Sequence, residues 1–174
     1  MKKKNGFTLV ELIAALAILS IGLTGITFAF SSAGQIRKNE DIKLDTAANC
    51  QIIAETFRAN GKVYLDDVYK TYPAKIKDAN NRNNIYLYIF FDDVSELKTN
   101  ISNKSFMQTI GITGNFSDCK SINTSGPKKK FGANIQITDF TDTNSYTLYR
   151  INATVWNLSY GENPNSQLTF YIGS

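Results

Sequence analysis

Histidine is absent from this chain of 174 residues, and cysteine and proline are scarce, with two and three residues. The chain therefore lacks the side chain that most often serves as a general base near neutral pH and as a metal ligand. It also holds no nucleophile-and-base constellation, no glycine-rich phosphate loop and no cysteine cluster with ligand spacing. We expect no enzymatic activity, no catalytic residue, no cofactor and no metal site.

The two cysteines, Cys50 and Cys119, leave two interpretations open. Outside the cytoplasm a pair of cysteines can form a disulfide, which here would tie a long helix to a loop of the C-terminal part. Alternatively both are free thiols, with Cys50 packed as a small apolar residue.

Charge is missing from a long N-terminal stretch, where Glu11 is the only charged residue between Lys4 and Arg37. The mostly apolar run 7–30 is long enough for a membrane-spanning helix, which needs about 20 residues. A carboxylate within such a span costs about 2.5–3.5 kcal/mol on insertion scales. A chain that keeps a carboxylate there is expected to use it.

Two ordinary interpretations of this segment explain less. A secretory signal peptide has an apolar core of about 7–15 residues before its cleavage site, and Ser32-Ala33-Gly34 resembles such a site, but the apolar run here is longer. A plain membrane anchor explains the three N-terminal lysines through the positive-inside bias. Neither interpretation explains why Gly6-Phe7 is followed at this spacing by Glu11.

The segment GFTLVELIAALAILSIGL, which begins at Gly6, resembles the N-terminus of type IV prepilins and pseudopilins. The resemblance implies that a prepilin peptidase removes residues 1–6 as a leader by cutting between Gly6 and Phe7. The same enzyme would methylate the new N-terminus of Phe7. Glu11 would pair with the terminal ammonium of a neighbouring subunit during assembly, in agreement with the strong attraction of opposite charges at low dielectric.

Leader removal also changes the charge balance. Losing the three lysines at positions 2–4 lowers the formal net charge from +4 to +1, so the basic balance is no evidence for nucleic-acid binding by the mature protein.

Two kinds of charged cluster lie in the C-terminal part. The lysine cluster Lys128-Lys129-Lys130 either contacts DNA or another anionic surface, or is a solvated loop, and a nucleic-acid partner stays open. Asp66-Asp67 and Asp92-Asp93 offer oxygen ligands for calcium, but neither belongs to a recognisable calcium loop.

We expect a single helix over 7–60, with a membrane or filament-core half at 7–30 and an amphipathic half at 31–60. Gly22 and Gly25 are its candidate weak point, and Gly61 follows as a C-cap glycine. The amphipathic half carries an apolar stripe at spacings of three or four, which is expected to pack on a sheet. The stripe consists of Leu44, Ala47, Cys50, Ile53, Ala54 and Phe57.

The remaining residues, 61–174, are expected to form a globular head with an antiparallel sheet. The sequence predicts an irregular connection over 62–84, with room for a short helix, and a polar loop over 114–130. Runs rich in β-branched and aromatic residues predict the strands. These runs are 85–91, 106–113, 131–140, 146–160 and 167–172. A long helix followed by such strands is an α+β fold, and this is also the type IV pilin-like layout that the resemblance implies.

The resemblance implies a structural subunit of a type IV pilus, which assembles with other pilin subunits through a platform protein and an assembly ATPase. The subunit would lie in the cytoplasmic membrane as a single-pass protein and then in an extracellular filament for adhesion, motility or DNA uptake. The stretch 16–23 further resembles the PilV-like minor pilins. Two alternatives stay open: a pseudopilin of a type II secretion or competence apparatus, and a membrane-anchored binding protein that never polymerises.

Overall fold

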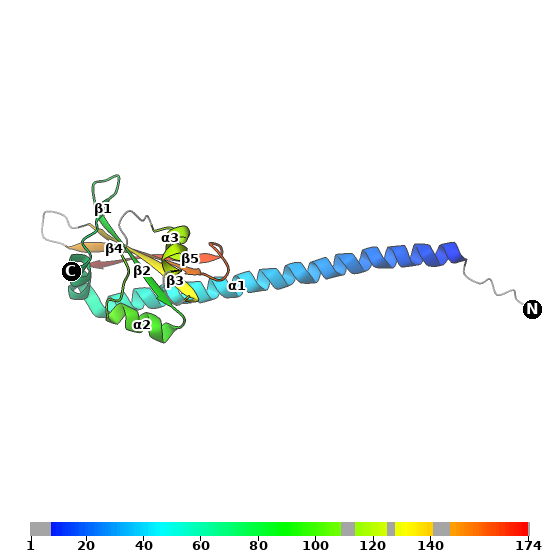
Figure 1. Cartoon of the computed structure of the whole chain (residues 1–174), viewed down its shortest axis with the longest axis horizontal. Coiled ribbons are helices and arrows are strands. Elements are labelled where there is room, and N and C mark those ends of the chain that lie inside the picture. Colours follow the sequence, from blue (N-terminus) through cyan, green and yellow to red (C-terminus); the bar gives the residue numbers. More distant parts are fainter. Residues whose placement is uncertain (1–7, 109–113, 125–127, 141–146, 174) are drawn as a thin grey trace, which may run out of the picture. The chain divides into compact units, whose positions relative to one another are not determined.

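The computed structural model describes residues 8–108, 114–124, 128–140 and 147–173 (Figure 1). The chain divides into two compact units, Met1–Glu40 and Asp41–Ser174. We call the first the N-terminal unit and the second the head. The described part of the N-terminal unit is helical from Leu9 onward, whereas the head contains a sheet, two short helices and the C-terminal half of the long helix.

The long helix is α1, Leu9–Thr71. Gly22 and Gly25 lie in regular helix, and α1 leaves helical geometry at Gly61, where φ is 72° and ψ is −171°. This is the glycine expected to end the helix, because only a residue without Cβ adopts such a backbone at low cost. A further helical stretch continues to Thr71, and it is the short helix for which the predicted connection over 62–84 left room. Its buried Leu65 and Val68 have helical spacing.

Five strands form one antiparallel sheet with the spatial order β1-β2-β3-β4-β5. The strands are β1 Ile76–Lys77, β2 Asn83–Phe91, β3 Phe131–Asp139, β4 Leu148–Asn157 and β5 Asn165–Gly173. Each strand therefore pairs with its neighbours in sequence. The predictions for β2, β3, β4 and β5 are confirmed, and the long helix with its antiparallel sheet confirms the predicted α+β class.

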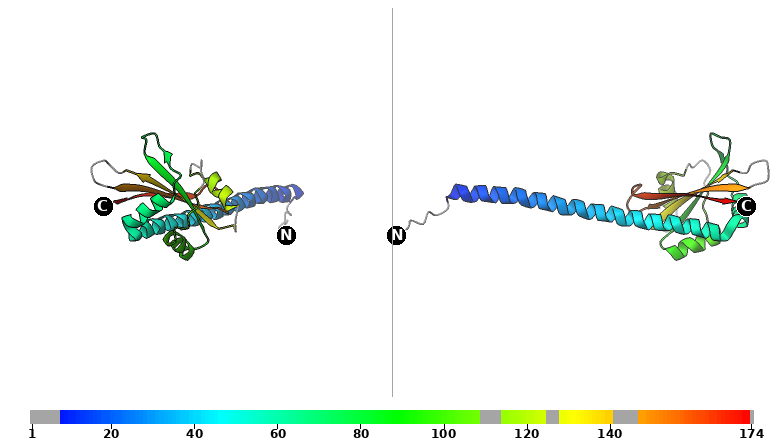
Figure 2. Two further views of the ribbon diagram at one scale, coloured as in Figure 1. Left: turned by 60° about the vertical axis from the view of Figure 1, so that its left-hand side comes forward. Right: turned by 180° about the vertical axis from the view of Figure 1, so that it is seen from behind.

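The larger apolar core lies between α1 and one face of the sheet (Figure 2). Odd-numbered residues of β2, β3 and β4 are buried there, opposite Cys50, Ile53, Ala54 and Phe57 of α1. The other two members of the predicted stripe, Leu44 and Ala47, are exposed. Ile42, Thr46 and Asn49 are buried in their place. The prediction failed there because Thr46, a polar residue, donates or accepts a 2.9 Å hydrogen bond with Ser166 of β5.

A second apolar cluster covers the opposite face of the sheet, around α3, Phe116–Asn123. Phe116 packs against Trp156 of β4 with ring centroids 6.1 Å apart. The loop predicted over 114–130 thus contains a helix, which the Asn115 side chain caps by accepting from the Asp118 N–H at 2.8 Å. The sequence shows this cap, but the helix is too short for a clear apolar period.

Two other predictions in this part of the chain need correction. Helix α2, Val94–Ser102, follows β2 and was not predicted. Asp93 caps it by accepting from the Glu96 N–H at 2.9 Å. The strand predicted over 106–113 is, in its described part, a bridge in which Met107 exchanges two main-chain hydrogen bonds with Tyr88. Residues 109–113 lie outside the described part.

Candidate functional site

The N-terminal end of α1 is built around Thr8 and Glu11. The Glu11 Oε2 atom accepts hydrogen bonds from the backbone N–H and the hydroxyl of Thr8, both at 2.9 Å. In return the Glu11 N–H donates to the Thr8 hydroxyl at 3.3 Å. This reciprocal arrangement is a capping box, and it satisfies donors that the first turn of a helix otherwise leaves unpaired.

Thr8 was not singled out from the sequence, although the signal was present. Thr8-Leu9-Val10-Glu11 has the Ser/Thr-x-x-Glu pattern of a capping box. The carboxylate of Glu11 therefore has a local structural role in addition to the predicted role in assembly. A test of the assembly role must keep these two roles apart.

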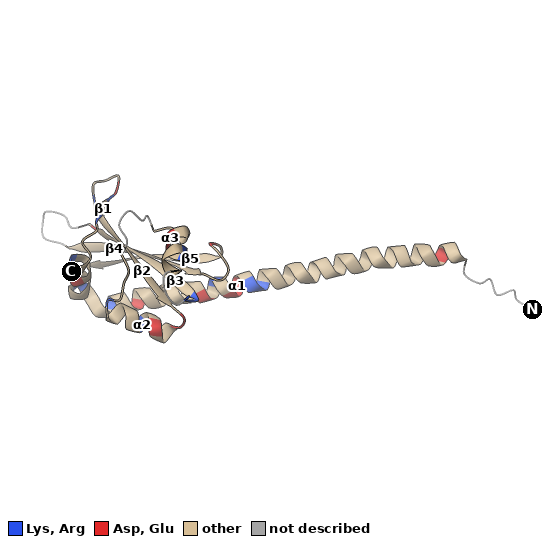
Figure 3. Cartoon of the chain, in the orientation of Figure 1, with Lys and Arg blue, Asp and Glu red and all other residues tan. Residues whose placement is uncertain are grey.

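An exposed apolar surface follows Glu11 along the N-terminal unit. Figure 3 shows one acidic position near the start of α1, followed by a long stretch without charge. In the sequence, the next charged residue after Glu11 is Arg37. An 18-residue window of α1 has a mean hydropathy of 2.3, and none of its residues is buried inside the structure. By length and composition, α1 is able to cross a membrane.

The hydroxyl side chains of this apolar stretch bond within the helix. Ser20, Thr24 and Thr27 each donate to a carbonyl three or four residues earlier, at 2.8 Å. Such bonds satisfy polar side chains without water. The stretch therefore suits an apolar environment in spite of its hydroxyl groups.

Gly6 and Phe7, the predicted cleavage and methylation positions, lie outside the described residues. The cut, the methyl group and the pairing of Glu11 with a neighbouring subunit stay predictions.

Comparison with known families identifies the N-terminal segment. A family model described as the prokaryotic N-terminal methylation motif matches residues 1–27. The chain carries the type IV prepilin signature. The long helix on an antiparallel sheet also matches the type IV pilin fold. A search of curated proteins and a search of solved structures found no match.

This prepilin signature implies processing by a prepilin peptidase and assembly with other pilins. Together with the apolar helix, it fits membrane anchoring of the precursor. The match ends at residue 27 and so assigns nothing to the head.

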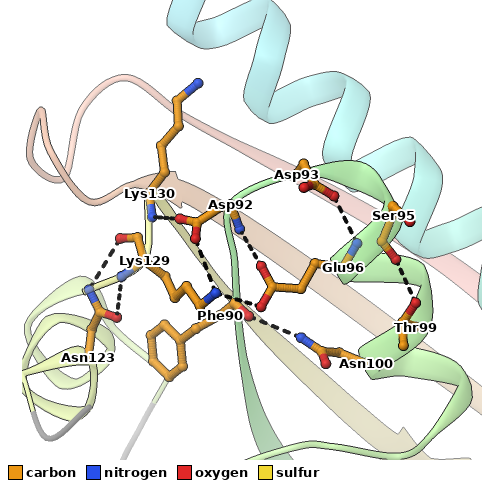
Figure 4. Close-up of polar contacts among 10 residues, drawn as sticks. All are labelled: Phe90, Asp92, Asp93, Ser95, Glu96, Thr99, Asn100, Asn123, Lys129 and Lys130. Atoms are coloured by element: carbon orange, nitrogen blue, oxygen red, sulfur yellow. Dashed lines mark hydrogen bonds and ion pairs between the residues drawn. The ribbon is translucent and has the colours of Figure 1, made fainter. Parts of the chain in front are cut away.

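In the head, the lysine cluster at 128–130 and the acidic pair Asp92-Asp93 contact each other (Figure 4). The Lys129 ammonium lies 3.1 Å from Asp92 Oδ2 and 2.6 Å from Glu96 Oε1. The other Asp92 oxygen accepts from the Lys130 N–H at 2.8 Å. The Asn123 side chain bonds both the N–H and the C=O of Lys129. We call Asp92, Glu96, Asn123 and Lys129 the head clip.

The head clip joins three separate segments: the turn before α2, the end of α3 and the start of β3. The Lys130 N–H and the Lys129 ammonium hold the pKa of Asp92 below its usual range. Hydrogen bonds from Lys129 to Glu96 and Asp92 raise the pKa of the lysine. Lys129 is thus engaged inside the head, and both oxygens of Asp92 are bonded, which weakens the DNA-binding and calcium interpretations at these residues.

The other acidic pair is also engaged within the head. Asp66 accepts from the Tyr149 hydroxyl at 2.8 Å and lies 3.7 Å from the Lys62 ammonium. Asp67 pairs with Lys104. Within the described residues, no group of three or more potential metal ligands from histidine, cysteine, aspartate and glutamate comes together.

The two cysteines are free thiols on opposite faces of the sheet. Cys50 packs in the larger core and donates to the Ser166 carbonyl at 3.2 Å. Cys119 packs beside Trp156 in the second cluster. The sheet lies between them, so the interpretation with a disulfide is wrong for this structure and the interpretation with free thiols holds. Burial raises the pKa of each thiol to about 12, which keeps both protonated near neutral pH.

Proposed function

We propose that this prepilin becomes a structural subunit, a minor pilin, of a type IV pilus and has no enzymatic activity. A prepilin peptidase removes residues 1–6. A platform protein and an assembly ATPase then move the subunit from the cytoplasmic membrane into an extracellular filament. The observation that carries the proposal is the N-terminal unit: within the methylation motif, an exposed apolar helix begins whose first turn holds one carboxylate, that of Glu11.

The surroundings of the Glu11 carboxylate set the cost of its charge. In an apolar surrounding an isolated charge is costly, and an opposite charge at close range offsets part of the cost. The terminal ammonium created by cleavage before Phe7 would supply such a charge from a neighbouring subunit. This pairing would fix the register of the incoming helix, while the apolar surface around it would pack against other helices.

Mass spectrometry of the mature N-terminus, on protein purified from its own host, tests the processing step. The expected result is a chain that begins with methylated Phe7. An intact Met1, or a cut near Ala33, would contradict the proposal and favour an anchored or secreted binding domain.

Substitution of Glu11 tests the assembly step, and the capping box dictates which substitution to use. Glutamine keeps the side-chain acceptor that a capping box needs but removes the charge. We expect Glu11→Gln to be cleaved normally and yet to be lost from sheared filaments by at least about tenfold, a factor worth about 1.4 kcal/mol. Glu40→Gln, on the same helix, is the matched control and should be incorporated like the wild type.

Normal incorporation of Glu11→Gln would show that Glu11 serves only as a helix cap. A pseudopilin is the second candidate, because the N-terminal signature is common to both kinds of subunit. The two are distinguished by deleting, in turn, the pilus assembly ATPase and the secretion ATPase of the host and asking which loss leaves the chain in the membrane.

A further inference from the structure

The two edges of the sheet in the head differ in how many of their main-chain groups have hydrogen-bond partners. At the β2 edge, β1 pairs with the first residues of the strand, Met107 bonds Tyr88, and the Asn100 side chain donates to the Phe90 carbonyl at 3.2 Å. β5 is the last strand on the other side, and no described segment pairs with its outer edge. Some main-chain N–H and C=O groups of β5 must therefore face outward.

The register of the sheet determines which main-chain groups of β5 face outward. In an antiparallel sheet, successive residues direct their N–H and C=O groups alternately to the two sides of the strand. Tyr88 bonds Met107 with both groups, at 2.7 and 2.8 Å, so its main chain points away from β3 and that of Leu87 points toward β3. Odd-numbered residues of β3 therefore bond β2, and its even-numbered residues bond β4.

The same alternation continues through β4 to β5. Even-numbered residues of β4 bond β3, which agrees with the 2.8 Å bond from the Phe140 N–H to the Leu148 carbonyl just beyond β3. Odd-numbered residues of β4, such as Ile151, then bond even-numbered residues of β5, such as Phe170. The N–H and C=O groups of Gln167, Thr169 and Tyr171 are left pointing outward. The side chains of these three residues are exposed as well.

This outer edge lacks the usual protection. Proteins block open edges with lysine or other charges, with proline, or with a bulge. The nine residues of β5 include no charged residue and no proline. Their register with β4 runs from Leu148↔Gly173 to Trp156↔Asn165 without a bulge. The edge is therefore geometrically ready to accept another strand.

A groove of about 540 Å³ adjoins this edge, between β5 and the part of α1 in the head. Its lining residues include two cations, Lys43 and Arg58, and no carboxylate is among them. The remaining lining residues are Ala47, Cys50, Gln51, Asn165, Ser166, Gln167 and Leu168. The helical rise between Lys43 and Arg58 is about 22 Å, the length of a strand of about seven residues.

We propose that the outer edge of β5, with the groove beside it, binds an extended acidic segment of a partner protein as a sixth strand of the sheet. Main-chain hydrogen bonds to Gln167, Thr169 and Tyr171 would supply the affinity, as in other strand additions. Carboxylates on alternate residues of the partner would face Lys43 and Arg58 and supply the selectivity. This site belongs to the head alone and does not depend on filament assembly.

The test uses the full chain in detergent and an end-blocked peptide of seven alternating valine and threonine residues, two of them replaced by glutamate. Binding of this peptide should slow amide hydrogen exchange at Gln167, Thr169 and Tyr171 by about tenfold or more. The same peptide with lysine in place of glutamate should bind at least about tenfold more weakly.

Two variants assign any binding to the site. Arg58→Glu should weaken the acidic peptide and strengthen the lysine peptide, whereas Lys98→Glu, on the exposed side of α2, should change neither. Thr169→Pro removes an outward N–H without removing a main-chain bond to β4, and should abolish edge protection. It also removes the 3.3 Å hydrogen bond from the Thr169 hydroxyl to Asn152. Unchanged slow exchange at Ile135 and Ile151 would show that the proline variant is folded.

Several results would overturn the proposal. These are no binding at millimolar peptide, equal binding of both peptides, and binding without protection of the three edge amides. Protection that appears without peptide and grows with protein concentration would also overturn it, because the occupant of the edge would then be a second copy of this chain.

Discussion

Single residues in the head show how closely its two apolar clusters approach the sheet. Gly132 lies in β3 and faces the second cluster. A Cβ atom at this position would overlap the Cys119 sulfur and come within 3.2 Å of Phe90 and Leu158. Glycine is needed here for space, since its backbone is that of an ordinary strand.

We therefore expect Gly132→Ala to lower the free energy of unfolding by about 1–3 kcal/mol, the usual cost of overpacking. Chemical denaturation of the head measures this change. Because the clash is with the Cys119 sulfur, Cys119→Ala should relieve part of it, so the double variant should be more stable than the sum of the single effects predicts. Strict additivity would contradict the contact.

At the scale of a single element, Gly61 decides where α1 breaks. Its φ of 72° and ψ of −171° lie in a region that is essentially restricted to glycine. No atom lies within 4 Å of a Cβ built at this position, so space does not require glycine and the backbone does.

Gly61→Ala should lower the free energy of unfolding by about 1–3 kcal/mol through backbone strain alone. Gly34→Ala is the matched control, because Gly34 lies in regular helix with open space around it. The control should be neutral or stabilising by up to about 1 kcal/mol. Thermal unfolding of both variants checks the prediction, and equal effects would contradict it.

The contribution of the head clip to the stability of the head depends on pH. The pKa of Asp92 is lowered in the folded head, so its contribution to stability is present above the unfolded pKa, near 3.9, and is lost as the pH falls through the folded pKa. The pKa of Lys129 is raised, so its contribution is present below about 10.4 and is lost as the pH rises through the folded pKa.

The difference in unfolding free energy between the wild type and Asp92→Asn should therefore be largest near neutral pH and vanish in acid. At low pH the protonated carboxyl resembles the amide. Urea unfolding of both proteins between about pH 3 and 7 measures this difference, in the range around the unfolded pKa. Lys129→Met should remove only part of it, because the hydrogen bond from the Lys130 N–H, the largest cause of the lowered pKa of Asp92, remains. A difference that is independent of pH would contradict the clip.

At the scale of the whole molecule, burial is confined to the head. The buried residues of the described chain all lie at position 42 or later, and the apolar surface before Glu40 is exposed. The N-terminal unit therefore adds nothing to the core of the head.

Deletion of residues 1–40 should leave a head that unfolds cooperatively, with a midpoint within about 4 °C of that of the full chain in detergent, or roughly 1 kcal/mol. Calorimetry of both proteins tests this expectation. A head fragment without a cooperative transition would show that the N-terminal unit is needed for folding.

The sequence alone determined the N-terminal segment, because its signals are local. A mostly apolar run, one carboxylate and a neighbouring glycine are recognisable without any distant contact. The strands β2 to β5 followed from their runs of β-branched and aromatic residues. The helices α2 and α3 were missed because their few turns carry little periodic signal. The stripe on α1 was partly wrong because Thr46 bonds Ser166, far away in the sequence.

Only the tertiary structure decided which distant residues meet. It placed Cys50 and Cys119 on opposite faces of the sheet and joined Lys129 to Asp92 and Glu96. It also left the outer edge of β5 open. Each of these outcomes depends on strand order and register, which fix the face and side that every residue takes. Those quantities arise from pairing between segments and cannot be read from any one of them.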